Sequence, residues 1–134
     1  MSALIYLICY NASEKMVIKM KLIHYINGKV ETNEQISDNN VQKNEKKYEF
    51  FLDNIRNNIY ITDRLVFIRQ NDDYIFTLEI SDKSFCTLEL IKEKQVLDIE
   101  VLEASYKEYE KYIDINYVLN TDQDKHHIIL EIEG

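Results

Sequence analysis

The sequence predicts an all-β protein with one antiparallel, up-and-down sheet of about eight to ten strands that closes into a barrel. Three observations support this fold class. Apolar residues recur at every second position over most of the chain, which is the period of half-buried strands. Valine, isoleucine, tyrosine, phenylalanine and threonine, which suit a pleated surface, are abundant. The connections between runs are short, about one to six residues, which favours hairpins over crossovers. Closure into a barrel would remove edge strands that promote aggregation.

Length and charge narrow the classes of protein. The 134 residues are enough for one domain, and the net charge of −8 disfavours binding to nucleic acid or to an anionic membrane surface. The segment "LIYLICY" is too short to span a bilayer. We expect residues 1–15 to form an N-terminal extension or an extra strand, and residues 16–134 to form a single β-barrel domain.

The two cysteines, Cys9 and Cys86, form no CxxC pair and provide no zinc site, and they suit a reducing cytoplasm. Cys86 alternates with Leu88 and Leu90, so we expect it to be a small buried apolar residue.

The first half of the chain begins with a strand over residues 16–26. One face of this strand carries Met16, Ile18, Met20, Leu22, His24 and Ile26. Asn27-Gly28 then predicts a type I′ turn, because both central positions of that turn need a positive φ. Residues 29–36 form a polar return strand, and "SDNNVQKNEK" (37–46) is expected to be a loop.

The remaining strands follow at even spacing, and only one segment is ambiguous. Residues 99–113 contain tyrosines at helical spacing, but clean alternation begins at Tyr112 and strands flank both sides. We therefore favour a hairpin with its turn in "YKEYEK" over a helix. The predicted runs are "KYEFFLD", "NIYIT", "RLVFIRQ", "YIFTLEIS", "SFCTLELIK", "VLDIEVLEA", "KYIDINYVL" and "HHIILEIE".

Several of these runs resemble the YwiB-like family of small uncharacterised bacterial proteins, which have a calycin-like (lipocalin-type) barrel. The resemblance spans about residues 16–133 and includes "MKLIHYINGKVE", the arginine that ends "RLVFIR", "VLDIEV" and the final "IILEIE". The chain departs from the family at Lys94-Gln95, where the family has Tyr-Gly, and at Asn71-Asp72, where it has a glycine. The resemblance implies a bacterial calycin-like barrel and brings no established activity with it.

No catalytic or metal motif stands out. With glycine only at positions 28 and 134, the chain has no phosphate-binding loop and no GxSxG elbow. His126 and His127 are adjacent on a strand and therefore point to opposite faces, so they cannot easily share a metal ion. The many carboxylates are typical of solvated strand faces. We expect no enzymatic activity, no metal and no cofactor.

Arg69 is the candidate for ligand binding, because it shares a strand face with Leu65 and Phe67. Two interpretations stay open. The arginine forms a salt bridge at the barrel rim with a nearby Asp or Glu, or it reaches inward and holds an anionic ligand. In the second case Tyr74, Phe76 and Tyr117 line the apolar part of the site.

Two hypotheses for function follow. The first is a binding protein for a small, partly apolar or anionic molecule held in the barrel. The second is an interaction or structural module with a filled core, acting through its surface as a monomer or homodimer. An enclosed pocket of about 300 Å³ or more would favour the first hypothesis.

Overall fold

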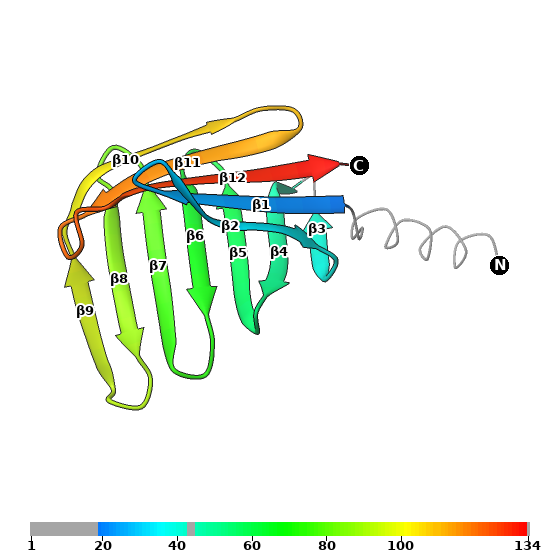
Figure 1. The fold of residues 1–134 in the computed structure, drawn as a ribbon. Coiled ribbons are helices and arrows are strands. Elements are labelled where there is room, and N and C mark those ends of the chain that lie inside the picture. Colours follow the sequence, from blue (N-terminus) through cyan, green and yellow to red (C-terminus); the bar gives the residue numbers. More distant parts are fainter. Residues whose placement is uncertain (1–18, 43–44, 134) are drawn as a thin grey trace.

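The computed structural model describes residues 19–42 and 45–133, so the expected N-terminal extension (1–15) lies outside the described residues. The described residues form β-strands joined by short turns, in two antiparallel sheets (Figure 1). The five-stranded sheet has the spatial order β10 (Val101–Glu108), β11 (Tyr112–Leu119), β12 (Lys125–Glu133), β1 (Lys19–Ile26), β2 (Lys29–Ile36). The seven-stranded sheet has the order β3 (Asn39–Gln42), β4 (Lys47–Leu52), β5 (Ile55–Ile61), β6 (Leu65–Gln70), β7 (Tyr74–Ile80), β8 (Phe85–Leu90), β9 (Gln95–Ile99). The prediction of an all-β, antiparallel fold is confirmed.

The strands of the small sheet run across those of the large sheet and cover one part of it (Figure 1). Two chain segments pass from one sheet to the other. Residues 37–38 connect β2 to β3, and Glu100 alone connects β9 to β10. Strands that change sheets at a bend are the usual corners of crossed β-sandwiches.

The predicted barrel closure is not found. Each strand pairs with its neighbour in sequence, and β12 pairs with β1, but β2 does not pair with β3 and β9 does not pair with β10. The described residues therefore form two sheets with edge strands β2, β3, β9 and β10. The reason is that each corner carries the chain directly into the opposite sheet, where no hairpin can bring the two strands side by side.

Local predictions are confirmed at two turns. Asn27 and Gly28 have φ values of 53° and 81°, as a type I′ turn requires. Residues 101–119 form a hairpin of β10 and β11, so the helical alternative at this segment is excluded. The predicted loop at 37–46 is wrong in part, because β3 lies within it. Val41 is only 1% exposed, and its burial against β4 outweighs the loop-like composition around it.

The core lies between the inner faces of the two sheets, where alternate residues of each strand meet. The largest side chains with less than 2% exposure come from both sheets: Met20, Phe50, Ile59, Leu65, Phe67, Leu78, Ile113, Ile115, Ile128 and Leu130. Cys86 is also buried and unpaired, as expected, and its burial raises the thiol pKa to about 11. Within the described residues, no helix is long and apolar enough to cross a membrane.

Candidate functional site

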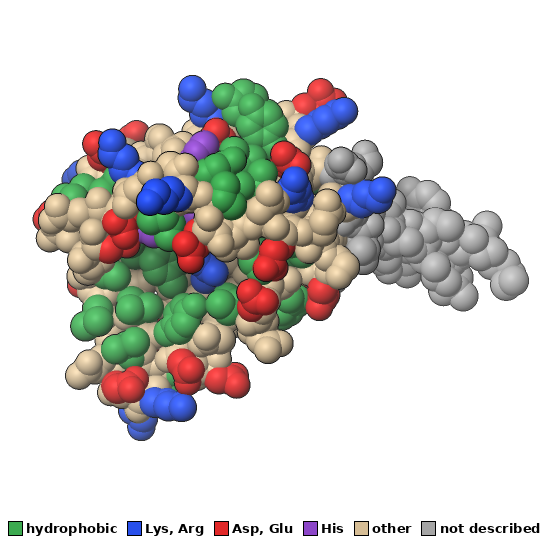
Figure 2. Space-filling view, in the orientation of Figure 1, with side chains coloured by type: hydrophobic (Ala, Val, Ile, Leu, Met, Phe, Trp, Pro, Cys, Tyr) green, Lys and Arg blue, Asp and Glu red, His purple; other side chains and the backbone are tan. Residues whose placement is uncertain are grey.

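A pocket opens where the large sheet extends beyond the small sheet. Its volume is about 190 Å³, and the space-filling view shows apolar side chains gathered over this region of β7, β8 and β9 (Figure 2). The structure brings all four sequence-predicted lining residues together there, along with four that were not predicted. The lining consists of Arg69, Tyr74, Phe76, Leu88, Tyr117, Leu119, Asp122 and His126. The pocket is smaller than the 300 Å³ expected for an enclosed ligand cavity, and it is an open groove.

Strand register places Arg69 on the inner face of the large sheet. Arg69 is paired with Asn57 on β5 and with Phe76 on β7, and Phe76 is paired with Leu88 on β8. Directly paired residues share a face, so the guanidinium group lies in a row between the polar Asn57 and the apolar Phe76 and Leu88. The inward orientation follows from the alternation with Leu65 and Phe67, both fully buried.

Arg69 has no anionic partner among the described residues. Its Nε atom is buried and makes no hydrogen bond, and no ion pair joins its guanidinium to a described carboxylate. The predicted rim salt bridge is therefore absent from this part of the chain. A half-buried cation without a partner is unfavourable, because the group loses water and gains nothing in return.

Aromatic rings form the wall beside Arg69. Phe76 lies with its ring centroid 6.4 Å from that of Tyr117, and Tyr117 stacks on His126 at 4.6 Å with an interplanar angle of 6°. Tyr117 is 5% exposed, and this burial raises the pKa of its hydroxyl, although the charge of Arg69 acts in the opposite direction. The phenol therefore stays neutral and provides an aromatic face.

Sequence reasoning missed a chain of hydrogen-bonding side chains next to this wall. Asp122, in the β11–β12 turn, lies with Oδ2 2.9 Å from His126 Nε2, and His126 Nδ1 lies 3.0 Å from His24 Nε2. An ionised carboxylate only accepts hydrogen bonds, so His126 donates from Nε2. His126 Nδ1 is then an acceptor, and His24 donates to it from Nε2.

The environment of these hydrogen-bonded side chains favours a neutral His24 and an ionised Asp122. Burial, with smaller effects of His126 and Arg69, lowers the pKa of His24 from 6.5 to about 4. For Asp122, burial acts to raise the pKa, but hydrogen bonds from His126 and from the backbone of Asp124 outweigh it. The net pKa of Asp122 is therefore lower than usual.

His127 points to the opposite face of β12, as predicted for adjacent residues of a strand. Its Nε2 atom lies 2.9 Å from Asp114 Oδ1, and its ring stacks on Tyr25. His126 and His127 therefore do not converge on one ligand.

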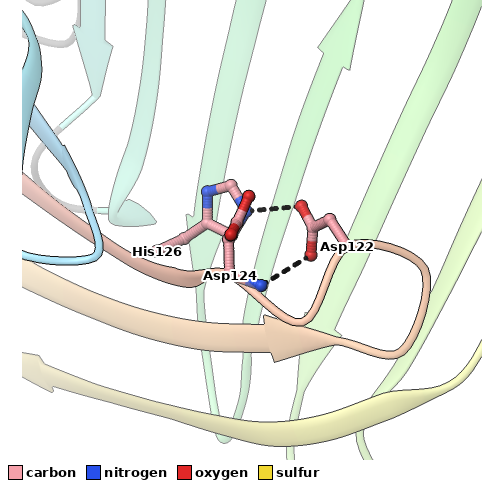
Figure 3. A group of neighbouring side chains, drawn as sticks. All are labelled: Asp122, Asp124 and His126. Atoms are coloured by element: carbon pink, nitrogen blue, oxygen red, sulfur yellow. Dashed lines mark hydrogen bonds and ion pairs between the residues drawn. The ribbon is translucent and has the colours of Figure 1, made fainter.

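Among the described residues, Asp122, Asp124 and His126 place one ligand atom each within 4.8 Å of one another, so this group could surround a metal ion (Figure 3). Their hydrogen bonds already use these groups. His126 Nε2 and the backbone nitrogen of Asp124 both donate to Asp122, and Asn27 Nδ2 donates to Asp124 Oδ1 at 2.9 Å. Arg69 also adds positive charge to the adjoining pocket. We therefore interpret the arrangement as a hydrogen-bonded turn and assign no metal to it.

A larger hollow, of about 400 Å³, lies over β10, β11 and β12. It is lined in part by the exposed polar residues Glu103, Ser105 and Asn116. It lacks an arginine and an unsatisfied buried polar atom, so its chemistry gives no reason for a specific ligand. The Arg69 pocket is the better candidate site.

Comparison of the chain with protein-family models, with curated proteins and with solved structures gives no match. The site must be interpreted from its own geometry.

Proposed function

We propose that this protein binds a small, partly apolar organic anion in the Arg69 pocket and has no enzymatic activity. The observation that carries the proposal is the uncompensated guanidinium of Arg69, which faces an aromatic groove. Carboxylates, sulfonates and phosphates match a guanidinium with two parallel hydrogen bonds. A bound anion would supply the partner that the described residues do not.

The dimensions of the pocket limit the size of the ligand. Drug-sized ligands occupy pockets of about 300–1,000 Å³. A volume of 190 Å³ suits a smaller molecule, with one ring or a short branched chain beside its anionic group. Phe76, Leu88 and Leu119 provide apolar contact for that part, while the open side leaves some of the ligand in water.

A binding role fits the residues around the two histidines better than catalysis does. Within the described part of the chain, no serine, threonine or cysteine is hydrogen-bonded to His24 or His126. An activated nucleophile needs such a contact with its base. The Asp122–His126–His24 chain therefore has no group to activate.

A calycin-like ancestry is a further part of the proposal. The support is the circular strand order, in which all sequence neighbours pair except at β2/β3 and β9/β10, and β12 returns to β1. A barrel of this type, opened at two corners, would have this order. The resemblance to the YwiB-like family and the cytoplasmic location remain predictions of the same kind.

The edge strands favour a second candidate function, an interaction module that is active as a homodimer. Large apolar side chains are exposed on and beside the edges β9 and β10: Phe85 (47%), Val96 (64%), Leu97 (44%) and Leu102 (45%). Exposed apolar groups at a sheet edge can pair with another chain.

The test of anion binding compares Arg69 with a matched arginine. A panel of small aromatic and aliphatic carboxylates and sulfonates is screened by ligand-observed NMR against the wild type, Arg69→Gln and Arg64→Gln. Arg64 lies just before the same strand but is paired with Glu79 at 3.2 Å, on the surface. We expect the Arg64 variant to bind like the wild type and the Arg69 variant to lose at least tenfold in affinity, about 1.4 kcal/mol.

Equal binding by all three proteins, or no binding of any anion, would refute the proposed function. Native mass spectrometry on the same samples tests the alternative, because a stable dimer without bound small molecules would favour the interaction module.

A further inference from the structure

Two histidines from opposite ends of the chain meet beside the proposed anion site. His126 lines the pocket, and its side chain is only 11% exposed. His24, on the adjacent strand β1, is hydrogen-bonded to His126, and the positive charge of Arg69 contributes to the lowered pKa of its imidazole. The pair is therefore coupled to the same cation that would hold the ligand.

The hydrogen-bonding pattern leaves room for one additional proton. In the neutral state His24 donates from Nε2 to His126, and His126 donates to Asp122. The Nδ1 atom of His24 is then unprotonated, and no hydrogen bond to it is formed by any described residue. A proton can bind to this atom without breaking either existing hydrogen bond, so protonation needs no rearrangement of the three side chains.

Without ligand, three effects oppose this proton: the burial of His24, its neighbour His126 and the positive charge of Arg69. An anion bound to Arg69 would cancel the third effect and place a negative charge close to the imidazole pair. The same anion would thus raise the pKa of His24 from its low value in the free protein.

We propose that the site takes up an organic anion together with one proton from solvent, Arg69 holding the anionic group and the His24–His126 pair accepting the proton. This inference rests on the proposed function and specifies its pH dependence. The inference requires a ligand that is ionised when bound, because a neutral molecule in the pocket would leave the charge of Arg69 in place.

The groups around His24 are consistent with this coupling. His126 of β12 is hydrogen-bonded to His24 and links it to Asp122. The charge of Arg69 on β6 also acts on His24. Tyr117 of β11 is neutral because of its raised pKa. On β2, Glu34 is on the same strand face as His24 but exposed. Arg69 is the only one of these groups that carries a fixed positive charge.

The direction of the pH effect follows from linkage. If the pKa of His24 is higher in the complex than in the free protein, the complex binds more protons, and affinity rises as pH falls through the higher value. Below the free-state pKa of about 4 both states are protonated and the effect ends. For one proton the slope is at most about tenfold in affinity per pH unit.

Benzenesulfonate is a suitable probe because it stays ionised, so any proton taken up must bind to the protein. Its affinity is measured by calorimetry between about pH 5 and pH 8, in buffers of different ionisation enthalpy. We expect tighter binding at lower pH and net proton uptake by the wild type. His127→Gln, on the outer face, should behave like the wild type, whereas in His24→Gln the affinity should no longer rise as pH falls. Benzyl alcohol serves as the neutral analogue.

The outcomes separate the two proposals. Binding of benzenesulfonate that depends on Arg69 but is independent of pH would overturn the proton uptake and leave the anion site standing. Absence of binding at every pH, to benzenesulfonate and to the carboxylates, would overturn both. If His24→Gln does not fold, NMR titration of the wild-type His24 imidazole decides, because its pKa must rise when benzenesulfonate saturates the protein.

Discussion

One row of paired residues crosses the inner face of the large sheet and is buried at one side but open at the other. Phe50 on β4 and Asn57 on β5 are 0% and 1% exposed, whereas Phe76 and Leu88 are half-buried and Leu97 on β9 is 44% exposed. Each residue of the row has the same inward position in the alternation of its own strand. The difference arises because the small sheet crosses the large one and covers only part of it (Figure 1). Burial along this row therefore depends on the opposite sheet, and Arg69 lies where coverage ends.

Replacing each of the two phenylalanines of this row by alanine should give the largest difference in stability between the two sides of the row. Phe50→Ala should destabilise the protein by about 3–5 kcal/mol, because it leaves a cavity in a closed core. Phe76→Ala should lose only about 1–2 kcal/mol, since water already reaches that ring. Urea unfolding followed by circular dichroism measures both. Equal losses would mean that the two sides are equally packed.

Low pH should decrease the free energy of unfolding through the protonation of His24. The folded-state pKa of His24, about 4, is below the unfolded value of 6.5, so the unfolded chain binds more protons between these values. Stability is therefore lost as pH falls from 6.5 towards 4, by on the order of 2 kcal/mol.

The matched variants for this prediction replace two histidines that lie on different faces of the small sheet. His24→Gln should flatten the pH dependence of the free energy of unfolding, while His127→Gln should leave it in place. A steep dependence that persists in His24→Gln would contradict the role of His24.

Replacing Arg69 with an apolar residue should strengthen the fold. Arg69→Leu removes a half-buried charge that has no described partner, and we expect a gain of about 1 kcal/mol together with loss of anion binding. Thermal unfolding with and without benzenesulfonate measures both effects. If the variant is less stable than the wild type, Arg69 has a structural role that outweighs its desolvation.

The smallest effect is expected on the surface, where Lys46 Nζ lies 3.0 Å from Glu108 Oε1 and links the two sheets. Lys46→Gln should cost less than about 1 kcal/mol, because the lysine is half-exposed and water screens the pair. The difference should disappear at high salt. A larger, salt-resistant loss would show that this contact helps to hold the sheets together.

Half of the candidate site was predictable from local sequence and half was not. Arg69, Tyr74, Phe76 and Tyr117 were identified because alternation assigns each to the inner face of a strand. His24 was also on the apolar face of its strand, and His126 alternates with Ile128 and Leu130. Their inward orientation was a usable signal, but their contact depends on the register of β1 against β12. That pairing joins residues about a hundred positions apart, which no local pattern specifies.

By itself, the sequence determined which way the side chains point along most strands and where the type I′ turn at Asn27-Gly28 lies, because side-chain alternation and a positive φ at these two residues are local properties of the backbone. Only the tertiary structure decided that the meander divides into two sheets at residues 37–38 and Glu100, that β3 forms within a loop-like segment, and that the small sheet leaves Arg69 half-covered. These outcomes depend on contacts between distant strands, and the free energy of those contacts is set by the whole assembly.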